Sequence, residues 1–235
     1  MKTLRSCLTI CTVCFFTSVL TLPLASNSYA QWNGDITLAS DYLFNGVSQT
    51  DEKPALQAGL TWSAENGLYA GTWASNVDYD DLANFELDAY LGYSLSLNEQ
   101  NSLDFGISQY NYFGSSNSST INYAELYIKY HLSQSSIAFW YAWDYFGTDA
   151  GHYIVMASHN FILTDSLSIL VGIDKSTSLD SNKWQWQAND DDYIHGQISV
   201  TYSFKHFDFS LGLHGTDLED YGDTKLLLSI SHGFG

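Results

Sequence analysis

Residues 85–97, FELDAYLGYSLSL, alternate between apolar and polar side chains along their whole length. The odd positions from Phe85 to Leu97 are apolar, whereas the even positions carry Glu86 and Asp88, followed by tyrosine, glycine and serine. A period of two predicts a β-strand with two chemically different faces. Such a strand buries its apolar face in a soluble sandwich, or turns it towards lipid in a membrane barrel. The fold therefore depends on which face points inward.

The same alternation recurs from residue 35 to residue 234. Most of the segments are close to the roughly 9 to 11 residues that a tilted transmembrane strand needs. Their number is even, as in the closed barrels of bacterial outer membranes. We therefore predict an all-β fold, a transmembrane antiparallel up-and-down β-barrel of about 12 strands. The predicted strands are Asp35–Gly46, Ala55–Ser63, Leu68–Val77, Phe85–Leu97, Leu103–Phe113, Tyr123–Leu132, Ile137–Phe146, Tyr153–Ile162, Leu167–Asp174, Ile194–Phe204, Phe207–His214 and Lys225–Phe234.

The connections between these segments alternate in length, which favours the barrel independently. Short turns follow the even-numbered segments, for example at residues 64–67 and 205–206. Longer and more acidic or polar connections follow most odd-numbered segments, the longest at residues 175–192. This asymmetry is typical of short periplasmic turns and longer outer loops, and it predicts that both termini are periplasmic.

Aromatic residues gather at the ends of several predicted strands. Outer-membrane barrels carry aromatic girdles where the wall meets the two membrane interfaces. We expect such girdles here, and the soluble sandwich remains the alternative from pattern alone. The aromatic groups are Tyr42 with Phe44, residues 110–113, residues 141–146, and Tyr202 with Phe204.

Residues 1–30 have the features of a cleaved signal peptide. Lys2 and Arg5 precede an apolar run at residues 8–22, and small residues stand before Gln31. We expect an exported barrel at residues 31–235, with an uncleaved membrane anchor as the alternative. All three cysteines lie in the leader, so neither disulfides nor thiolate chemistry are expected in the barrel. The barrel keeps six lysines, no arginine and all 26 acidic residues, which argues against nucleic acid as a partner.

The inward face of a twelve-stranded barrel encloses a narrow pore at most. An excess of negative charge on that face predicts a preference for cations over anions. A structural bridge from Glu86 or Glu125 to Lys129 is the alternative role for these charges. The pore-lining candidates are Asp41, Glu86, Asp88, Asp104, Glu125, Tyr127, Lys129, Asp144, His195 and Asp208.

Metal sites, cofactors and catalysis have little support in the sequence, and no metal, cofactor or catalytic residue is predicted. Residues 190–192 are three aspartates, which suit a divalent cation, but they lack the spacing of a calcium loop and read better as a solvated loop. Trp184 and Trp186 could stack on a sugar, contact lipopolysaccharide or belong to a girdle. A lipid-acting barrel enzyme needs a serine beside a histidine base on the outer wall. The neighbours Ser158 and His159 point to opposite faces of their strand.

Several stretches together resemble the TorF family of provisionally assigned porins of proteobacterial outer membranes. The resemblance lies in residues 38–59, 67–79, 85–94, 143–147 and 213–218. It implies an outer-membrane β-barrel with no established substrate. Asn45 departs from the family, which usually has arginine there. The family-motif positions include Asp41, Gly46, Ser48, Gln49, Trp73, Ser75, Asn76 and Asp78.

These observations predict a porin that passes small hydrophilic solutes by diffusion, with a preference for cations. A plugged barrel whose loops bind a surface partner is the first alternative, and a lipid-acting enzyme of the outer membrane is the second. The expected partners are outer-membrane lipid and lipopolysaccharide, small solutes or cations, and the barrel assembly machinery during insertion.

Overall fold

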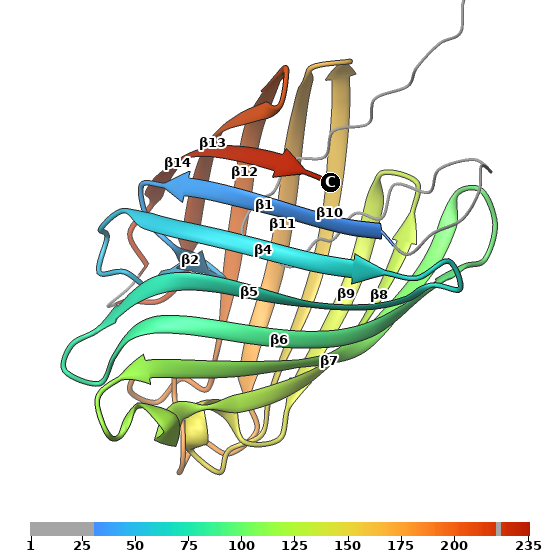
Figure 1. Ribbon diagram of the computed structural model, residues 1–235. Coiled ribbons are helices and arrows are strands. Elements are labelled where there is room, and N and C mark those ends of the chain that lie inside the picture. Colours follow the sequence, from blue (N-terminus) through green and yellow to red (C-terminus); the bar gives the residue numbers. More distant parts are fainter. Residues whose placement is uncertain (1–30, 220–221) are drawn as a thin grey trace, which may run out of the picture.

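The chain forms a closed antiparallel barrel of twelve strands, which confirms the predicted fold class (Figure 1). The computed structural model describes residues 31–219 and 222–235, and the predicted leader at residues 1–30 lies outside them. Each strand pairs with its neighbours in the sequence, and the first pairs with the last to close the wall. The strands are β1 (Gln31–Ala39), β4 (Ala55–Ser63), β5 (Leu68–Tyr79), β6 (Ala83–Ser96), β7 (Asn101–Gly114), β8 (Tyr123–Leu132), β9 (Ser135–Ala142), β10 (His152–Thr164), β11 (Leu167–Ser178), β12 (Asp192–Phe204), β13 (Phe207–Thr216) and β14 (Lys225–Phe234).

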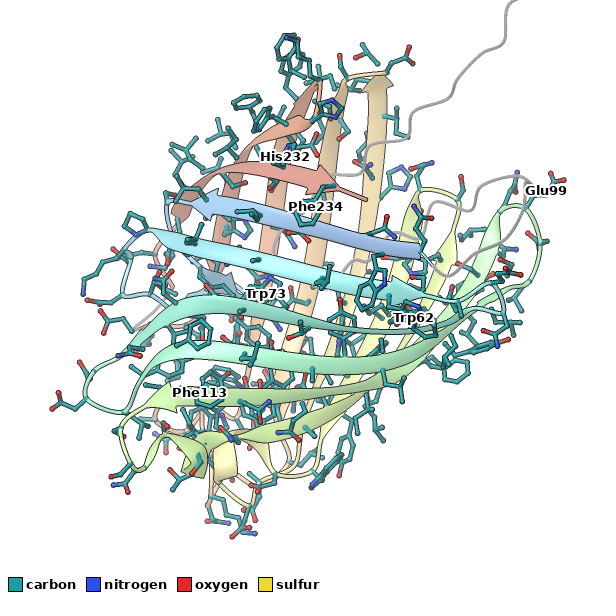
Figure 2. All side chains as sticks on the ribbon, viewed as in Figure 1. Trp62, Trp73, Glu99, Phe113, His232 and Phe234 are labelled. Carbon is teal, nitrogen blue, oxygen red and sulfur yellow. The ribbon has the colours of Figure 1, made fainter. Side chains whose placement is uncertain are left out.

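The closing seam joins β1 to β14 and leaves no open sheet edge in the wall. Gly34 lies opposite Phe234 in this pairing. A Cβ at position 34 would lie 2.5 Å from the ring of Phe234, so only glycine lets the ring lie across the strand. Figure 2 shows Phe234 at the end of β14, beside β1. The seam is therefore packed by an aromatic side chain as well as by backbone hydrogen bonds.

The two faces of the wall answer the question raised by residues 85–97. Glu86 and Asp88 are 1% and 0% exposed inside the barrel, whereas Leu91 is 50% exposed on its outside. The apolar face therefore points outward, as a membrane barrel requires and a soluble sandwich forbids. The same outward exposure recurs around the wall, at Leu38, Leu56, Ile107, Leu126, Ile128, Ile137, Val155, Ile173, Ile198, Leu211, Leu213 and Leu226.

The first predicted strand is too long at its end. β1 stops at Ala39, and residues 40–54 turn into the barrel instead of continuing the wall. They contain a small hairpin of β2 (Leu43–Phe44) and β3 (Val47–Ser48) that pairs with no barrel strand. Asn45 and Gly46 at its tip have positive φ, which ends a regular strand. The alternation of side chains in the sequence continues past Ala39, but the strand ends there.

Two short 3-10 helices, η1 (Ser118–Ile121) and η2 (Tyr145–Gly147), lie in the longer connections. The second replaces the end of a predicted strand, because β9 stops at Ala142 rather than at Phe146. In the described part of the chain, no helix has both the length and the apolar character needed to cross a membrane.

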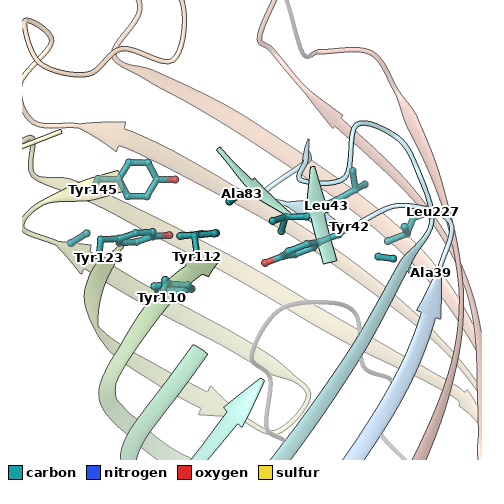
Figure 3. Packing of buried hydrophobic residues seen from close by; sticks show 12 residues of the cluster. Ala39, Tyr42, Leu43, Ala83, Tyr110, Tyr112, Tyr123, Tyr145 and Leu227 are labelled. Carbon is teal, nitrogen blue, oxygen red and sulfur yellow. The ribbon is translucent and has the colours of Figure 1, made fainter. Parts of the chain in front are cut away.

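The predicted aromatic girdle is only partly present at the end of the barrel that carries the longer connections, here called the loop end, where Phe113 and Trp143 are exposed but four tyrosines are not. Four tyrosines are buried inside the barrel and belong to one hydrophobic cluster: Tyr42, Tyr110, Tyr112 and Tyr145. Figure 3 shows the Tyr42 hydroxyl directed towards Tyr110, Tyr112 and Tyr123. At the opposite end, which we call the turn end, Tyr202 and Phe204 are exposed outward as expected. Strand parity places Tyr110 and Tyr112 inside, because they share a face of β7 with the buried Asp104. Tyr42 and Tyr145 lie in connections that turn into the barrel.

Candidate functional site

The hairpin β2–β3 reaches through the inside of the barrel to the wall formed by β11 and β12. Asn45 is completely buried, and its Nδ2 donates to Ser176 Oγ at 3.1 Å. The hydroxyl of Tyr193 donates to the backbone oxygen of Asn45 at 3.0 Å. A Cβ at Gly46 would lie 2.6 Å from Cδ2 of His195, so a side chain could not be added at the tip without moving the hairpin. The tip is therefore fixed against β11 and β12.

A group of hydrogen bonds centred on Asp41 holds the base of this hairpin. Its Oδ1 accepts from Ser48 Oγ at 2.7 Å and from Thr50 Oγ1 at 2.8 Å. Burial raises the pKa of the Asp41 carboxyl, and these hydrogen bonds oppose the rise. Tyr42, the next residue, packs edge-on against Trp73 with ring centroids 5.2 Å apart. Asp41 thus has a structural role, whatever it adds to the charge of the lumen.

The remaining family-motif residues join the hairpin to β4 and β5. Gln49 accepts a hydrogen bond from the Tyr79 hydroxyl, and its backbone oxygen accepts from the Asp78 amide at 2.8 Å. Lys53 Nζ lies 2.6 Å from the Asp78 carboxylate, and Asn76 Oδ1 accepts from the Leu56 amide at 2.8 Å. The hydroxyl of the buried Ser75 donates to the neighbouring backbone oxygen at 2.9 Å. The motif therefore specifies how residues 40–54 fold inward.

Three of the pore-lining candidates form a buried acidic group on β6 and β8. Glu86, Asp88 and Glu125 all lie inside the loop-end half of the barrel. The Tyr110 hydroxyl donates to Glu125 Oε2 at 2.9 Å, and the Tyr112 hydroxyl lies 3.3 Å from Glu86 Oε1. Glu86 and Glu125 thus each lie beside a tyrosine hydroxyl, and the bridge to Lys129 considered from the sequence stays a prediction. The arrangement gathers three carboxyl groups beside the hairpin.

Another three candidates, Asp104, Tyr127 and Lys129, lie together nearer the turn end. The hydroxyl of Tyr69 donates to Asp104 Oδ1 at 2.5 Å and lies 2.6 Å from the Tyr127 hydroxyl. Lys129 Nζ lies 4.8 Å from the ring centroid of Tyr127 and 5.7 Å from that of Trp140, within the range of cation–π attraction. This wall, formed by β5 to β10, is aromatic and carries charge.

The wall formed by β12 and β13 presents small polar side chains, which we call the polar ladder. It consists of His195, Gln197, Ser199, Thr201 and Ser203 on β12, which pair across the strands with Thr216, His214, Gly212, Ser210 and Asp208 on β13. Thr201 Oγ1 donates to Ser210 Oγ at 3.2 Å, and Ser203 Oγ donates to Asp208 Oδ1 at 2.5 Å. The ladder therefore runs as a row of hydroxyl and amide groups from the hairpin tip to the turn end.

A chain of hydrogen bonds begins the ladder beside the hairpin tip. His195 Nδ1 lies 2.7 Å from Asp174 Oδ2, and His195 Nε2 lies 3.2 Å from His214 Nδ1. His195 was a candidate from the sequence, whereas its partners Asp174 and His214 were not. Strand parity alone places all three inside, but only the register between β11, β12 and β13 makes them neighbours.

Asp144 is the candidate that the structure places elsewhere. Because β9 ends at Ala142, Asp144 lies in the following loop, where its Oδ1 accepts from the Asp149 amide at 2.7 Å. It therefore shapes a loop instead of facing the lumen from a strand. That the other nine candidates line a pore stays a prediction.

Trp184 and Trp186 point into the mouth of the barrel. Both lie with ring centroids 5.9 Å from that of Tyr145, whose ring stacks on His152 at 4.0 Å. We call residues 179–191, which carry the two tryptophans, the cap loop. Its position explains why these side chains are only partly exposed.

The aspartates at residues 190–192 do not converge on one point. Asp190 Oδ2 accepts from Gln187 Nε2 at 3.2 Å, whereas Asp192 pairs with Lys175 at 2.7 Å. Within residues 31–219 and 222–235, no group of three histidine, cysteine or acidic side chains has the arrangement of a metal site.

A serine and a histidine do meet on the outward face, at the turn end. Ser135 Oγ lies 2.7 Å from His159 Nδ1, across the β9–β10 pair. His159 also packs edge-on against Phe161 at 4.4 Å. Among the described residues, no carboxylate is hydrogen-bonded to His159 to orient it, so the pair lacks the third member of a catalytic triad.

Residues 25–234 match the family described as "Bacterial protein of unknown function (Gcw_chp)". No curated protein matches the sequence. Among solved structures, the KdgM porin in complex with disordered oligogalacturonate is similar, with a TM-score of 0.56 and 10% identity over 86% of this chain and 99% of that chain. The NanC porin has a TM-score of 0.55 and 11% identity over 85% and 97%. An outer membrane channel from Pseudomonas putida F1 has a TM-score of 0.52 and 14% identity over 89% and 97%. At these identities the likeness concerns the fold.

Proposed function

This chain belongs to the Gcw_chp family of bacterial proteins of unknown function, and we propose that it is a porin-type diffusion channel of the outer membrane. The observation that carries the proposal is the inverted wall, apolar outside and lined inside by carboxylates, hydroxyls and imidazoles. In a soluble protein this apolar outer face would be exposed to water, whereas in a membrane channel it contacts lipid. The shared fold of two porins and an outer membrane channel supports the same function.

The passage we propose follows the polar ladder. Ser199, Thr201 and Ser203 offer hydrogen bonds that replace part of the hydration of a small hydrophilic solute. The opposite wall is filled by larger side chains such as Tyr127 and Trp140, which leaves the ladder as the polar route. Transport is passive: the solute diffuses along the wall and exchanges hydrogen bonds with water for hydrogen bonds with the ladder, which requires no energy source.

The proposed channel prefers cations to anions. Glu86, Asp88, Asp104 and Glu125 lie inside the barrel with Lys129 as the basic residue among the candidates. Fixed negative charge in a narrow lumen raises the local concentration of cations and lowers that of anions. The sign of the preference depends on the sum of these charges and not on any single side chain.

We also propose how the protein reaches its membrane. Residues 1–30 act as a cleaved signal peptide, the barrel assembly machinery inserts residues 31–235, and both termini face the periplasm. The apolar outer band then contacts lipid, and the longer loops contact lipopolysaccharide. The similarity to TorF sequences supports this location, and we propose that the chain is a member of that family.

Ion conductance tests the proposal directly. Purified barrel is added to a planar bilayer, and the reversal potential is measured in a salt gradient. Discrete steps with a reversal potential of the cation-selective sign are expected. A barrel that is folded by circular dichroism but silent at all voltages contradicts the channel function. Steps with the anion-selective sign contradict only the cation preference.

A second function is favoured by the side chains that close the loop end. The hairpin β2–β3 and the cap loop both pack into the mouth, and the barrel could therefore serve as a plugged scaffold whose loops bind a surface partner. Removing residues 43–48 distinguishes the two. A channel gains conductance when this obstruction is removed, whereas a scaffold that is filled throughout stays silent.

A further inference from the structure

The outer face of β5, β6 and β7 differs from the rest of the apolar band. These strands lie next to one another along one side of the barrel (Figure 1). Parity places Thr72, Ala89 and Gln109 on the outside. The register puts them in one row, because Thr72 pairs with Ala89 and Ala89 pairs with Gln109. We use the name amide patch for this row and its outward neighbours, which together are Ala70, Thr72, Ala74, Ala89, Gln109 and Asn111.

Elsewhere the wall carries large apolar side chains in the middle of its strands. Val200, Leu211 and Leu228 form a comparable row across β12, β13 and β14, and all three are exposed outward. Such side chains suit contact with acyl chains. The carboxamides of Gln109 and Asn111 do not, because lipid offers no hydrogen bonds to polar groups. The amide patch is therefore a part of the outer face that lipid alone solvates poorly.

Gln109 lies midway between the two membrane interfaces. Near the loop end, Phe113 packs against Phe85 with ring centroids 6.2 Å apart, and near the turn end Phe105 packs against Tyr93 at 5.9 Å. Figure 2 shows Phe113 near the end of β7. Outward aromatic residues of this kind mark the interfaces of a barrel wall. Gln109 is four residues from each phenylalanine of β7, about 13 Å along the strand, and so lies near mid-bilayer.

Hydrogen bonds to the backbone hold both amides against the wall. Gln109 Nε2 donates to the backbone oxygens of Tyr123 at 2.9 Å and of Tyr110 at 3.1 Å. Asn111 Nδ2 donates to the backbone oxygen of Leu87 at 3.0 Å, and more weakly to that of Gln109 at 3.4 Å. Within residues 31–219 and 222–235, no group donates to Gln109 Oε1 or to Asn111 Oδ1. The two oxygens therefore need donors from outside the barrel.

We propose that the amide patch is the contact surface between two copies of this chain in the membrane. A two-fold axis places Asn111 of the second copy opposite Gln109, and Gln109 of the second copy opposite Asn111. Two facing carboxamides exchange two hydrogen bonds, from Asn111 Nδ2 to Gln109 Oε1 and from Gln109 Nε2 to Asn111 Oδ1. Gln109 keeps its shorter bond to Tyr123 and gives up the longer one. The inference rests on the proposed membrane location and not on the channel function.

The chemistry of the patch favours a second copy over other occupants. Acyl chains have no donors, and a transmembrane helix already uses its backbone hydrogens within itself. A second copy carries the complementary amides by symmetry. The small side chains of Ala70, Ala74 and Ala89 let the two walls approach closely. Inside lipid, association depends on such close packing and on hydrogen bonds, because burying apolar surface brings no gain there.

Cysteine cross-linking in isolated outer membranes tests the contact in the full-length chain. The three native cysteines all precede residue 31, so the wild type reports any product formed through them. Ala89→Cys adds a thiol within the patch and leaves both amides in place. A short bismaleimide is expected to join two copies into a product of doubled mass on a denaturing gel.

Leu211→Cys is the matched control, because Leu211 is exposed on the outer wall of β13, away from the patch. It is expected to give much less product than Ala89→Cys. Equal amounts of product from both variants, or no product from either, overturn the interface. A product of another mass from Ala89→Cys identifies a different partner and also overturns it.

Replacing the amides tests the hydrogen bonds themselves. Gln109→Leu and Asn111→Leu each put an apolar side chain in place of a carboxamide. Each is expected to weaken dimerisation about 3- to 30-fold, the range for polar contacts within membranes. The dissociation constant is measured in lipid vesicles, by energy transfer between copies labelled at Leu211→Cys. Circular dichroism confirms that each variant is folded.

Gln100→Leu makes the same chemical change in the turn between β6 and β7, and it should leave the dissociation constant unchanged. Dissociation constants that are the same in the wild type and in all three leucine variants overturn the amide contact.

Conductance in a planar bilayer separates this inference from the channel. Discrete steps from a chain that neither cross-links nor shows energy transfer overturn the dimer and leave the channel standing. A cross-linked dimer that is folded but silent overturns the channel and leaves the dimer standing. Conductance from a chain that cross-links through Ala89→Cys supports both.

Discussion

Gly46 lies against the imidazole of His195, so close that a Cβ at position 46 would stand 2.6 Å from His195 Cδ2 and 2.7 Å from Thr216 Cγ2. The two residues come from opposite ends of the sequence and meet inside the barrel. Gly46 also has φ of +82°, a conformation that other residues adopt at a cost. The contact therefore decides how deeply the inward hairpin reaches into the lumen.

Gly46→Val should displace the hairpin tip and widen the passage. The added branches overlap His195, and valine disfavours the positive φ. We expect larger single-channel conductance with an unchanged circular dichroism spectrum. Gly196→Ala on β12 is the control, because no atom lies within 4 Å of the Cβ it would add. Conductance that is identical in all three proteins would show that the hairpin does not limit the passage.

Leu91→Lys should destabilise the barrel by about 2 to 4 kcal/mol, the range for a lysine on the lipid face near mid-bilayer. The side chain of Leu91 is half exposed on the outer wall. Leu97→Lys is the matched control, because Leu97 is equally exposed but follows the end of β6, where the same change costs about 0 to 1 kcal/mol. Urea unfolding in lipid vesicles measures both. Equal losses of unfolding free energy in Leu91→Lys and Leu97→Lys contradict the placement of Leu91 nearer to mid-bilayer than Leu97.

Glu125→Gln should weaken cation preference and retain the fold. Glutamine still accepts the hydrogen bond that the Tyr110 hydroxyl donates to Glu125 at 2.9 Å, but it removes one ionisable carboxyl group from the lumen. The reversal potential in a salt gradient should move towards zero. Asp165→Asn removes a charge from the turn between β10 and β11 and serves as the control. A shift of the same size in the control assigns the selectivity to surface charge.

Trp186→Ala should release the cap loop. The Trp186 ring packs edge-on against Tyr193 at 4.6 Å and against His152 at 5.5 Å. Losing about 1 to 2 kcal/mol of local packing makes opening about 5 to 30 times more frequent. Limited proteolysis should cut residues 179–191 faster by that factor, with the barrel intact. Gln185→Ala, an exposed position in the same loop, should leave the rate unchanged. A Trp186→Ala rate within twofold of the wild type shows that the ring does not hold the loop.

The sequence by itself determined the class of the fold and the direction of its faces. A period of two is a local property of the chain, so residues 85–97 already separate Leu91 from Glu86 and Asp88. The alternation of short and long connections is also local, and it orders the strands into an up-and-down wall. These features are readable because each depends only on neighbouring residues.

Only the tertiary structure decided what fills the barrel. The alternation runs past Ala39 as though β1 continued, yet Asp41 meets Ser48 and Thr50, and Gln49 meets Tyr79, so residues 40–54 turn inward. Parity already puts Tyr110 and Tyr112 on the inward face, whereas the burial of Tyr42 and Tyr145 depends on connections that turn into the barrel. Contacts across the lumen depend on closure and register, which bring distant residues together.

In the polar ladder, too, the sequence predicts the face of each side chain, and the tertiary structure determines its partners. Parity places Gln197, Ser199 and His195 on one face of β12, and this much is visible in the sequence. Their partners Asp174, Gly212 and His214 lie 13 to 21 residues away on other strands, at separations that no periodicity encodes. The pairing of β11, β12 and β13 brings them together, because a one-residue change of register would turn every one of these side chains to the other face.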